Sequence, residues 1–184
     1  MITTKNCTNP SKDCRGNHTM KTIVLGVGNP ILRDDGVGIH VVNQVKKHVQ
    51  DPNVTIDEAY TGGMNLLDMI QGYDKAILID AVKIKDAQPG EVKRFLLSEF
   101  SSVHSHNPHD VSLGEALQLA KKLRVDKIPR EIVVIGIVVK ELPFVFGEHL
   151  SSTAAAAVPK AVQMTLSELG KNDNRSHWRN DKVT

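Results

Sequence analysis

Two aspartates and a histidine, far apart along the chain, offer the clearest chemistry in this sequence. Asp35 follows an apolar run and a glycine-rich turn, Asp80 ends a second apolar run, and His109 lies in a polar loop before a helical pattern. Because the carboxyl ends of parallel strands meet at one edge of a sheet, we expect all three side chains to reach that edge. Two carboxylates and an imidazole form a ligand set with open coordination positions, suited to nickel, zinc or manganese.

Each of these residues also has a simpler interpretation. Asp34 or Asp35 is equally explained as the N-cap of the following helix, because aspartate is favoured at that position. Asp80 is also explained as a cap or as a partner of a loop, although a carboxylate at the end of a buried strand needs some compensating group. His109 is open to the capping interpretation as well. Two further histidines of that loop are expected to be exposed, His104 and His106.

The glycine-rich turn after the first apolar run invites comparison with a dinucleotide site. That fingerprint is Gly-x-Gly-x-x-Gly, but Ile31 stands at the third glycine position and Pro30 stiffens the turn. Asp34 and Asp35 would also place negative charge beside a pyrophosphate. A nucleotide-binding oxidoreductase is therefore the less favoured alternative, and a pair of carboxylates suits a cation or acid–base chemistry better.

The length, composition and charge of the chain indicate one globular domain. The chain has 184 residues, 40% of them hydrophobic and 24% charged, and a formal net charge of +2. The basic excess belongs to segments 1–19 and 171–184, so the body of the chain is slightly acidic and we expect it not to bind nucleic acid. No signal peptide and no apolar run long enough for a bilayer are found in the sequence, which predicts no membrane partner and a cytoplasmic location.

Strand and helix patterns alternate between residues 21 and 170. Strands are expected at 23–27, 54–59, 75–80, 91–97 and 132–138, and helices from 37 onward and at 64–71, 111–123 and 152–169. Gly72 and Gly170 are expected to end two of the helices. This order predicts an α/β fold, a three-layer α/β/α sandwich on a mostly parallel, mixed sheet of about five strands. Charge on one face places strand 91–97 near an edge, in antiparallel orientation.

The single domain is expected to span residues 21–170, between disordered tails at 1–20 and 171–184. Both cysteines, Cys7 and Cys14, lie in the first tail. With His18 they outline an incomplete metal site, because a fourth ligand is missing and the spacing is not that of a usual zinc site. Two cysteines in a disordered tail is the simpler interpretation. Met20, directly before the first strand, is an alternative start of the chain.

Several motifs, taken in order, resemble the hydrogenase maturation endopeptidases. In chain order they are GVGN at 26–29, DDGVG at 34–38, ILIDA at 77–81, PGE at 89–91, NPH at 107–109, GI at 136–137 and VPKAV at 158–162. The match covers residues 21–169 in one register. Each motif is short, but their order and spacing together are specific to that family.

The resemblance implies an endopeptidase that removes a short C-terminal extension from the large-subunit precursor of a [NiFe]-hydrogenase after nickel insertion. Carried over by position, the metal-contacting and catalytic residues of the family fall on Asp35, Asp80 and His109. Contacts with the precursor are expected at Asn29, Thr61 and Gly63. In this scheme nickel arrives with the precursor, so the enzyme itself holds no tight metal and no organic cofactor, and we expect it to act as a monomer.

The sequence departs from the family pattern in two loops. The family often has an acid followed by two glycines after its second strand, where this chain has Glu58-Ala59-Tyr60. A proline-containing turn is usual after the motif at 136–137, where this chain continues with 138–140 as Val-Val-Lys. We expect both loops to determine which hydrogenase the enzyme processes. A non-catalytic nickel-site chaperone or regulator of hydrogenase assembly, on the same fold, is an alternative that would use the same ligands.

Overall fold

The computed structural model describes residues 19–60, 63–97, 122, 127–140, 146–147 and 149–171. Its elements in chain order are β1 (Thr22–Val27), η1 (Arg33–Gly36), α1 (Val37–Val45), β2 (Val54–Ala59), α2 (Gly63–Ile70), β3 (Lys75–Val82), β4 (Val92–Leu96), β5 (Glu131–Val138) and α5 (Ser152–Gly170). Of the predicted helix at 111–123 only residue 122 is described, and of the two predicted tails only residues 19–20 and 171 are described.

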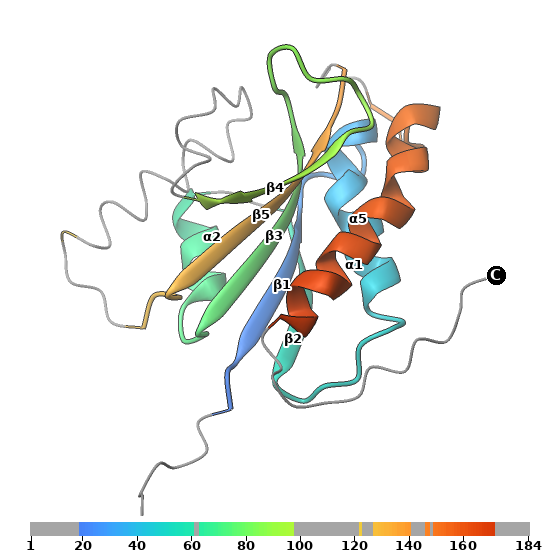
Figure 1. Ribbon diagram of the computed structural model, residues 1–184. Helices are drawn as coiled ribbons and strands as arrows, with labels where there is room; N and C mark the ends of the chain where they lie inside the picture. Colours follow the sequence, from blue (N-terminus) through green and yellow to red (C-terminus); the bar gives the residue numbers. More distant parts are fainter. Residues whose placement is uncertain are drawn as a thin grey trace, which may run out of the picture.

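A five-stranded mixed sheet forms the centre of the molecule, in the order β2-β1-β3-β5-β4 (Figure 1). β1 pairs in parallel with both β2 and β3, and β3 pairs in parallel with β5. β4 lies at the edge and runs antiparallel to β5. The mixed sheet, the edge position of β4 and its orientation are confirmed. The long apolar runs of β1, β3 and β5 are those of parallel strands covered on both faces.

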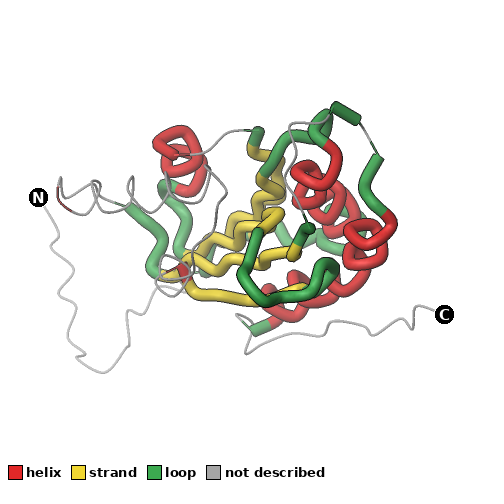
Figure 2. Tube along the Cα trace, turned by 90° about the horizontal axis from the view of Figure 1, so that it is seen from above, coloured by secondary structure: helices red, strands yellow, loops and turns green. Residues whose placement is uncertain are grey.

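Helices cover both faces of the sheet, which makes the predicted three-layer α/β/α sandwich. Figure 2 looks down on the sheet and shows α2 on one side and the pair α1 and α5 on the other. Alternate residues of β3 divide between the two cores: Leu78 packs in the α2 core, whereas Ile77 and Ile79 pack in the α1–α5 core. None of the helices in the described part is both long and apolar enough to cross a membrane.

Glycines allow α1 to rest directly on the ends of two strands. A Cβ atom on Gly38 would lie 2.2 Å from the carbonyl oxygen of Ile79 and 2.5 Å from that of Val27. Gly26 lies inside β1, and a Cβ atom there would come 2.4 Å from the Gly38 carbonyl oxygen. Only glycines permit this approach, which brings the start of α1 and the preceding η1 over the carboxyl ends of β1 and β3.

The last helix ends at Gly170, as predicted, and this glycine is its final residue. Lys171 is the C-cap in right-handed helical conformation, and its Nζ lies 2.8 Å from Glu168 Oε2. Gly72, two residues beyond the end of α2, has φ +89°, the left-handed conformation with which a glycine ends a helix, as predicted.

Candidate active site

Asp35 is held inside η1, directly beyond the carboxyl end of β1. Its side chain is 8% exposed, and its Oδ2 accepts a hydrogen bond of 2.7 Å from the backbone N–H of Asn29. Gly28 makes this fold-back possible: its φ is +130°, and a Cβ atom there would lie 1.9 Å from the Asp35 carbonyl oxygen. The turn predicted from the glycines therefore serves to place one carboxylate.

The amides of this loop are used inside the protein. The N–H of Gly28 donates to the Ala59 carbonyl oxygen at 3.1 Å, and that of Leu32 donates to the Asn29 carbonyl oxygen at 3.0 Å. The N–H of Ile31 donates to Asn29 Oδ1 at 3.1 Å. A dinucleotide site needs such amides to face a pyrophosphate. Because these amides already have partners, the loop geometry argues against the oxidoreductase alternative.

Asp34 connects η1 to the start of α5. Its Oδ1 accepts from the Ser151 N–H at 2.6 Å and its Oδ2 accepts from the Ser151 hydroxyl at 2.7 Å. The capping interpretation of the two aspartates is wrong, because the N-cap of α1 is Gly36 and has no side-chain hydrogen bond. The physical reason is η1, which precedes α1 and directs Asp34 to α5 and Asp35 to the loop amide.

Asp80 lies in the last third of β3 and is 2% exposed. The prediction that this strand ends at the aspartate is wrong: pairing with β5 continues to Val82, opposite Val138. Side chains alternate along a strand, so Asp80 shares the α2 face of the sheet with Leu78 and Val82. η1 packs against β3. Asp35 and Asp80 therefore both belong to the carboxyl edge of the sheet, as predicted.

The other predicted site residues are only partly described. His109 and Thr61 lie outside the described residues, and Gly63 is the first residue of α2. Asn29 lies in the site loop, where its backbone and side-chain oxygen serve the hydrogen bonds given above. Within the described ranges, no three His, Cys, Asp or Glu side chains gather as a metal-holding group. Of the three predicted metal-contacting residues, the described structure therefore contains only the two carboxylates, Asp35 and Asp80.

Tyr60, which the sequence indicated only as a departure from the family, stands at the end of β2 and is 60% exposed. Its hydroxyl donates a hydrogen bond to Glu58, and Lys46 Nζ lies 3.6 Å from the same carboxylate. The hydrogen bond from Tyr60 is the main reason why the pKa of Glu58 lies below its usual value. Glu58, near the end of β2, therefore has local partners on the enzyme itself.

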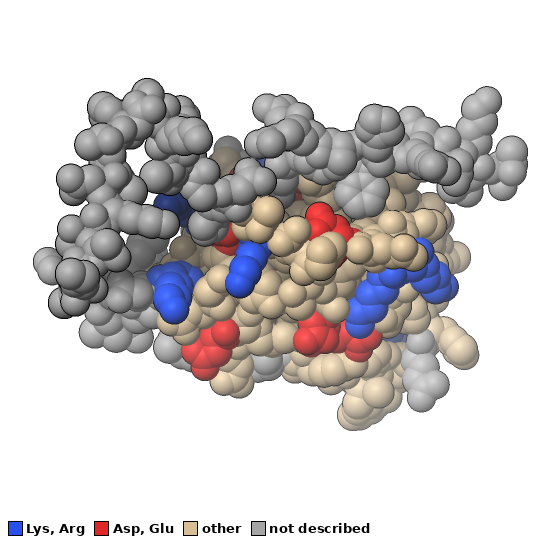
Figure 3. Space-filling model, turned by 90° about the horizontal axis from the view of Figure 1, so that it is seen from below, with Lys and Arg blue, Asp and Glu red and all other residues tan. Residues whose placement is uncertain are grey.

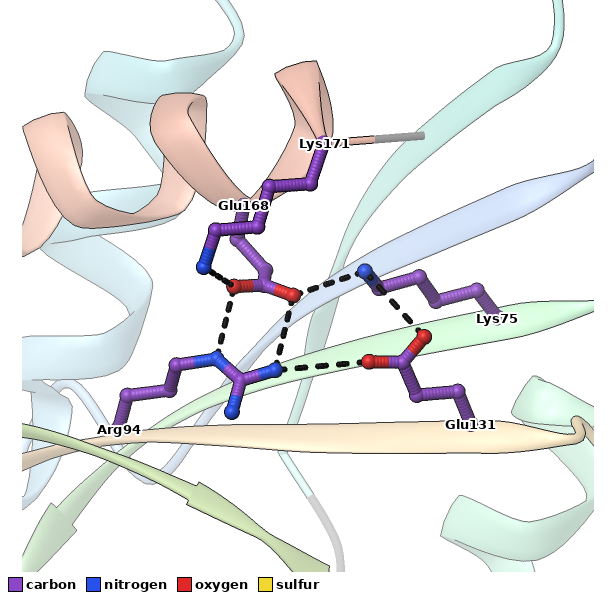
Figure 4. Close-up of polar contacts among 5 residues, drawn as sticks. All are labelled: Lys75, Arg94, Glu131, Glu168 and Lys171. Atoms are coloured by element: carbon purple, nitrogen blue, oxygen red, sulfur yellow. Dashed lines mark hydrogen bonds and ion pairs between the residues drawn. The ribbon is translucent and has the colours of Figure 1, made fainter. Parts of the chain in front are cut away.

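A second polar cluster, which the sequence did not indicate, lies toward the opposite edge of the sheet (Figure 4). Its centre is Glu168 of α5, 1% exposed, and its members are Lys75, Arg94, Glu131, Glu168 and Lys171. Lys75 Nζ lies 2.8 Å from Glu168 Oε1, and Arg94 Nε lies 2.7 Å from Oε2. Figure 3 views the molecule from this end, where basic and acidic side chains are interspersed on the described surface.

These contacts determine the charge of Glu168. Burial alone raises the pKa of this carboxyl group, but hydrogen bonds from Arg94, Lys171 and Lys75 outweigh it and lower the pKa to about 2. No sequence motif marks the cluster, because its members come from three strands and one helix. The only hint is a lysine at the start of a strand that is otherwise apolar.

An α/β/α sandwich on a mostly parallel sheet, with carboxylates at the carboxyl edge, places the chain in the class of α/β enzymes, and solved structures show which fold of that class it has. The hydrogenase maturating endopeptidase HybD from Escherichia coli superposes with a TM-score of 0.73 over 84% of this chain and 94% of that one, at 24% identity. The [NiFe] hydrogenase maturation protease HybD from Thermococcus kodakarensis gives a TM-score of 0.63 at 26% identity, covering 81% and 99% of the two chains.

The sequence relatives agree with the fold. A putative hydrogenase maturation protease of Methanocaldococcus jannaschii is 32% identical over 154 residues, 81% of this chain and 96% of its own. The coenzyme F420 hydrogenase subunit delta of Methanothermobacter thermautotrophicus is 30% identical over 156 residues, 80% of this chain and 94% of its own. The family description "HycI: hydrogenase maturation protease" matches residues 39–168. The chain belongs to this family of endopeptidases, which hydrolyse peptide bonds, and the resemblance found in the sequence is confirmed.

Proposed function

We propose that this endopeptidase removes the C-terminal extension of a [NiFe]-hydrogenase large-subunit precursor after nickel insertion, and that it recognises the nickel ion carried by that precursor. The observation that supports this proposal is the pair Asp35 and Asp80, two carboxylates brought to one edge of the sheet from distant parts of the chain. Family membership supplies the reaction class, and the carboxylates supply the recognition chemistry.

The charge of Asp35 suits a cation brought from outside. Its described hydrogen-bond donor is a neutral backbone amide, which orients the carboxylate without neutralising it. Asp80 is 2% exposed and lies opposite Gly136 of β5, near the carboxyl end of β3. A nickel ion held by precursor thiolates accepts further oxygen and nitrogen donors. We propose Asp35, Asp80 and His109 as those donors.

Docking of the nickel ion places the scissile peptide against the enzyme. Holding the reacting groups in one geometry removes much of the entropic cost of bringing them together. Either a carboxylate or the metal then orients the attacking water. A precursor without nickel lacks this anchor and binds weakly, so cleavage reports that the metal has been inserted. The predicted monomeric state and cytoplasmic location complete the proposal.

The test is cleavage of purified precursor, loaded with nickel or metal-free, followed by mass spectrometry. We expect loss of the extension only from the nickel-loaded precursor, and loss of that activity in Asp80→Asn and His109→Ala. Asp68→Ala, at an exposed position of α2, is the matched control and is expected to cleave normally. A stable complex without cleavage would favour the chaperone alternative. Equal cleavage of metal-free precursor would contradict nickel recognition.

A further inference from the structure

Large apolar side chains are exposed mainly at the carboxyl edge. Among the described residues these are Met20, Ile31, Tyr60 and Phe146, which are 39%, 48%, 60% and 78% exposed. Met20 precedes β1 at the opposite edge, whereas Tyr60 follows β2, and Ile31 and Phe146 lie in segments after β1 and β5. Their concentration at the edge that carries Asp35 and Asp80 indicates a contact surface, since grouped exposed apolar residues mark interaction sites.

Ile31 and Phe146 are held beside each other by a short backbone bridge. Leu32 and Gly147 form an isolated parallel bridge. The Gly147 N–H donates to the Ile31 carbonyl oxygen at 2.9 Å, and the Arg33 N–H donates to the Gly147 carbonyl oxygen at 2.8 Å. In a parallel bridge the residues that precede the paired positions are lateral neighbours. The backbone positions of Ile31 and Phe146 are therefore adjacent, and these two exposed residues are called here the Ile31–Phe146 patch.

The patch is fixed relative to the carboxylate of the candidate active site. Arg33 both closes the bridge and begins η1, which contains Asp35. Four residues of chain span at most about 14 Å, so Ile31 cannot lie farther than that from Asp35 along the backbone. The side chain of Arg33 also packs against Gly147, where an added Cβ atom would lie 3.0 Å from Arg33 Cγ. The bridge thus presents the patch in a defined position, which lowers the entropy lost on binding.

We propose that the Ile31–Phe146 patch is a docking surface for an apolar stretch of the hydrogenase large-subunit precursor, next to the part that carries nickel. This inference rests on the proposed function and adds a contact that does not depend on the metal. Continuity with the carboxyl edge favours this occupant: Ile31 lies within four residues of Asp35, so a polypeptide whose nickel reaches Asp35 is within reach of the patch. The apolar character of both side chains selects aliphatic or aromatic residues of that polypeptide.

Substitutions at both positions test the docking surface. Ile31→Ser, Phe146→Ser and the double variant are compared with Met20→Ser, an exposed apolar residue at the opposite edge. With nickel-loaded precursor we expect KM to rise about fivefold to tenfold for each single variant and more for the double variant, because central apolar contacts dominate interfaces. We expect kcat to stay within twofold, and Met20→Ser to match the wild type. Binding of metal-free precursor, measured by calorimetry, should weaken in parallel.

The outcomes separate this inference from the proposed function. Wild-type enzyme that leaves nickel-loaded precursor uncut contradicts the proposed function itself. Active wild-type enzyme with unchanged KM and unchanged precursor binding in all patch variants contradicts the docking surface alone. A fall in kcat without a change in KM also contradicts it, because the residues would then act by positioning Asp35. Variants that dissociate a wild-type dimer while KM stays constant would assign the patch to a second copy of the chain.

Discussion

Buried carboxylates at the two edges of the sheet have different kinds of hydrogen-bond partner. Near the amino edge, Glu168 is surrounded by the cationic groups of Lys75, Arg94 and Lys171, at 2.7–2.8 Å for the shortest contact of each. At the carboxyl edge, Asp35 is oriented by a neutral backbone N–H at 2.7 Å. Both side chains are buried, yet only the first is compensated by nearby cations that the described structure itself supplies.

This difference in partners distinguishes a structural carboxylate from a functional one in this fold. A carboxylate whose oxygens are already bound by cations has little attraction left for an external ion, and removing it leaves those cations buried without a counter-charge. A carboxylate oriented by a neutral donor keeps its charge and remains attractive to a cation. Burial alone does not distinguish them, because Glu168 and Asp35 are both buried. The kind of partner does.

The largest expected effect is on cleavage by Asp35→Asn. Asparagine keeps an oxygen that can accept the Asn29 N–H but removes the negative charge, so the fold should be retained while the proposed nickel contact is lost. We expect kcat/KM for nickel-loaded precursor to fall about a thousandfold, in the range for removal of a catalytic polar group. Steady-state cleavage measures the fall, and thermal unfolding checks that Tm changes little. Near-normal cleavage would remove Asp35 from the site.

The reverse pattern is expected for Glu168→Gln. This variant leaves the Lys75 ammonium group, which is 2% exposed, without its main counter-charge. Removing one partner of a buried ion pair typically costs about 3–5 kcal/mol of unfolding free energy. Urea titration measures the loss, and the paired change Glu168→Gln with Lys75→Met should recover part of it. A selective loss of cleavage in folded Glu168→Gln would break the contrast between the two edges.

Acid should weaken the amino edge over a defined pH range. The pKa of Glu168 in the folded protein is about 2, below its usual value of 4.5, so its contribution is fully present above pH 4.5 and is lost as the pH falls toward 2. We expect the difference in unfolding free energy between wild type and Glu168→Gln to shrink over that range. Urea titrations at several pH values measure it. A constant difference would show that the ion pairs do not determine the effect.

A smaller effect is expected where α5 meets η1. Ser151→Ala removes a hydroxyl that donates to Asp34 at 2.7 Å and accepts from the Ala154 N–H at 3.2 Å. Loss of an N-cap side chain costs about 1 kcal/mol, and the second hydrogen bond adds a similar amount. We expect a Tm lower by several degrees and a modest fall in kcat, because η1 also carries Asp35. Ser151→Thr, which keeps the hydroxyl, is the matched control and should restore both.

Much of the fold followed from pattern alone. Continuous apolar runs predicted the buried strands β1, β3 and β5, and charge on one face of residues 91–97 predicted the edge strand β4. Local pattern was weaker at boundaries: β3 extends past Asp80 because β5 offers pairing as far as Val138. The helix after Asp35 was expected from periodicity, but η1 before it was not, since a short 3-10 turn leaves no periodic signal.

By itself, the sequence determined the layered α/β class and the placement of Asp35 and Asp80 at one edge, because alternating strand and helix patterns indicate parallel strands whose carboxyl ends meet. The order of its short motifs determined the family. Only the tertiary structure decided which carboxylates serve which purpose. Asp34 accepts a hydrogen bond from the residue before α5, and Asp35 accepts one from a loop amide. Glu168 accepts hydrogen bonds from three cationic side chains that lie far apart in the sequence or in the next turn. Those roles depend on contacts between residues far apart in the chain, and electrostatic compensation is a property of distance in space rather than of spacing in sequence.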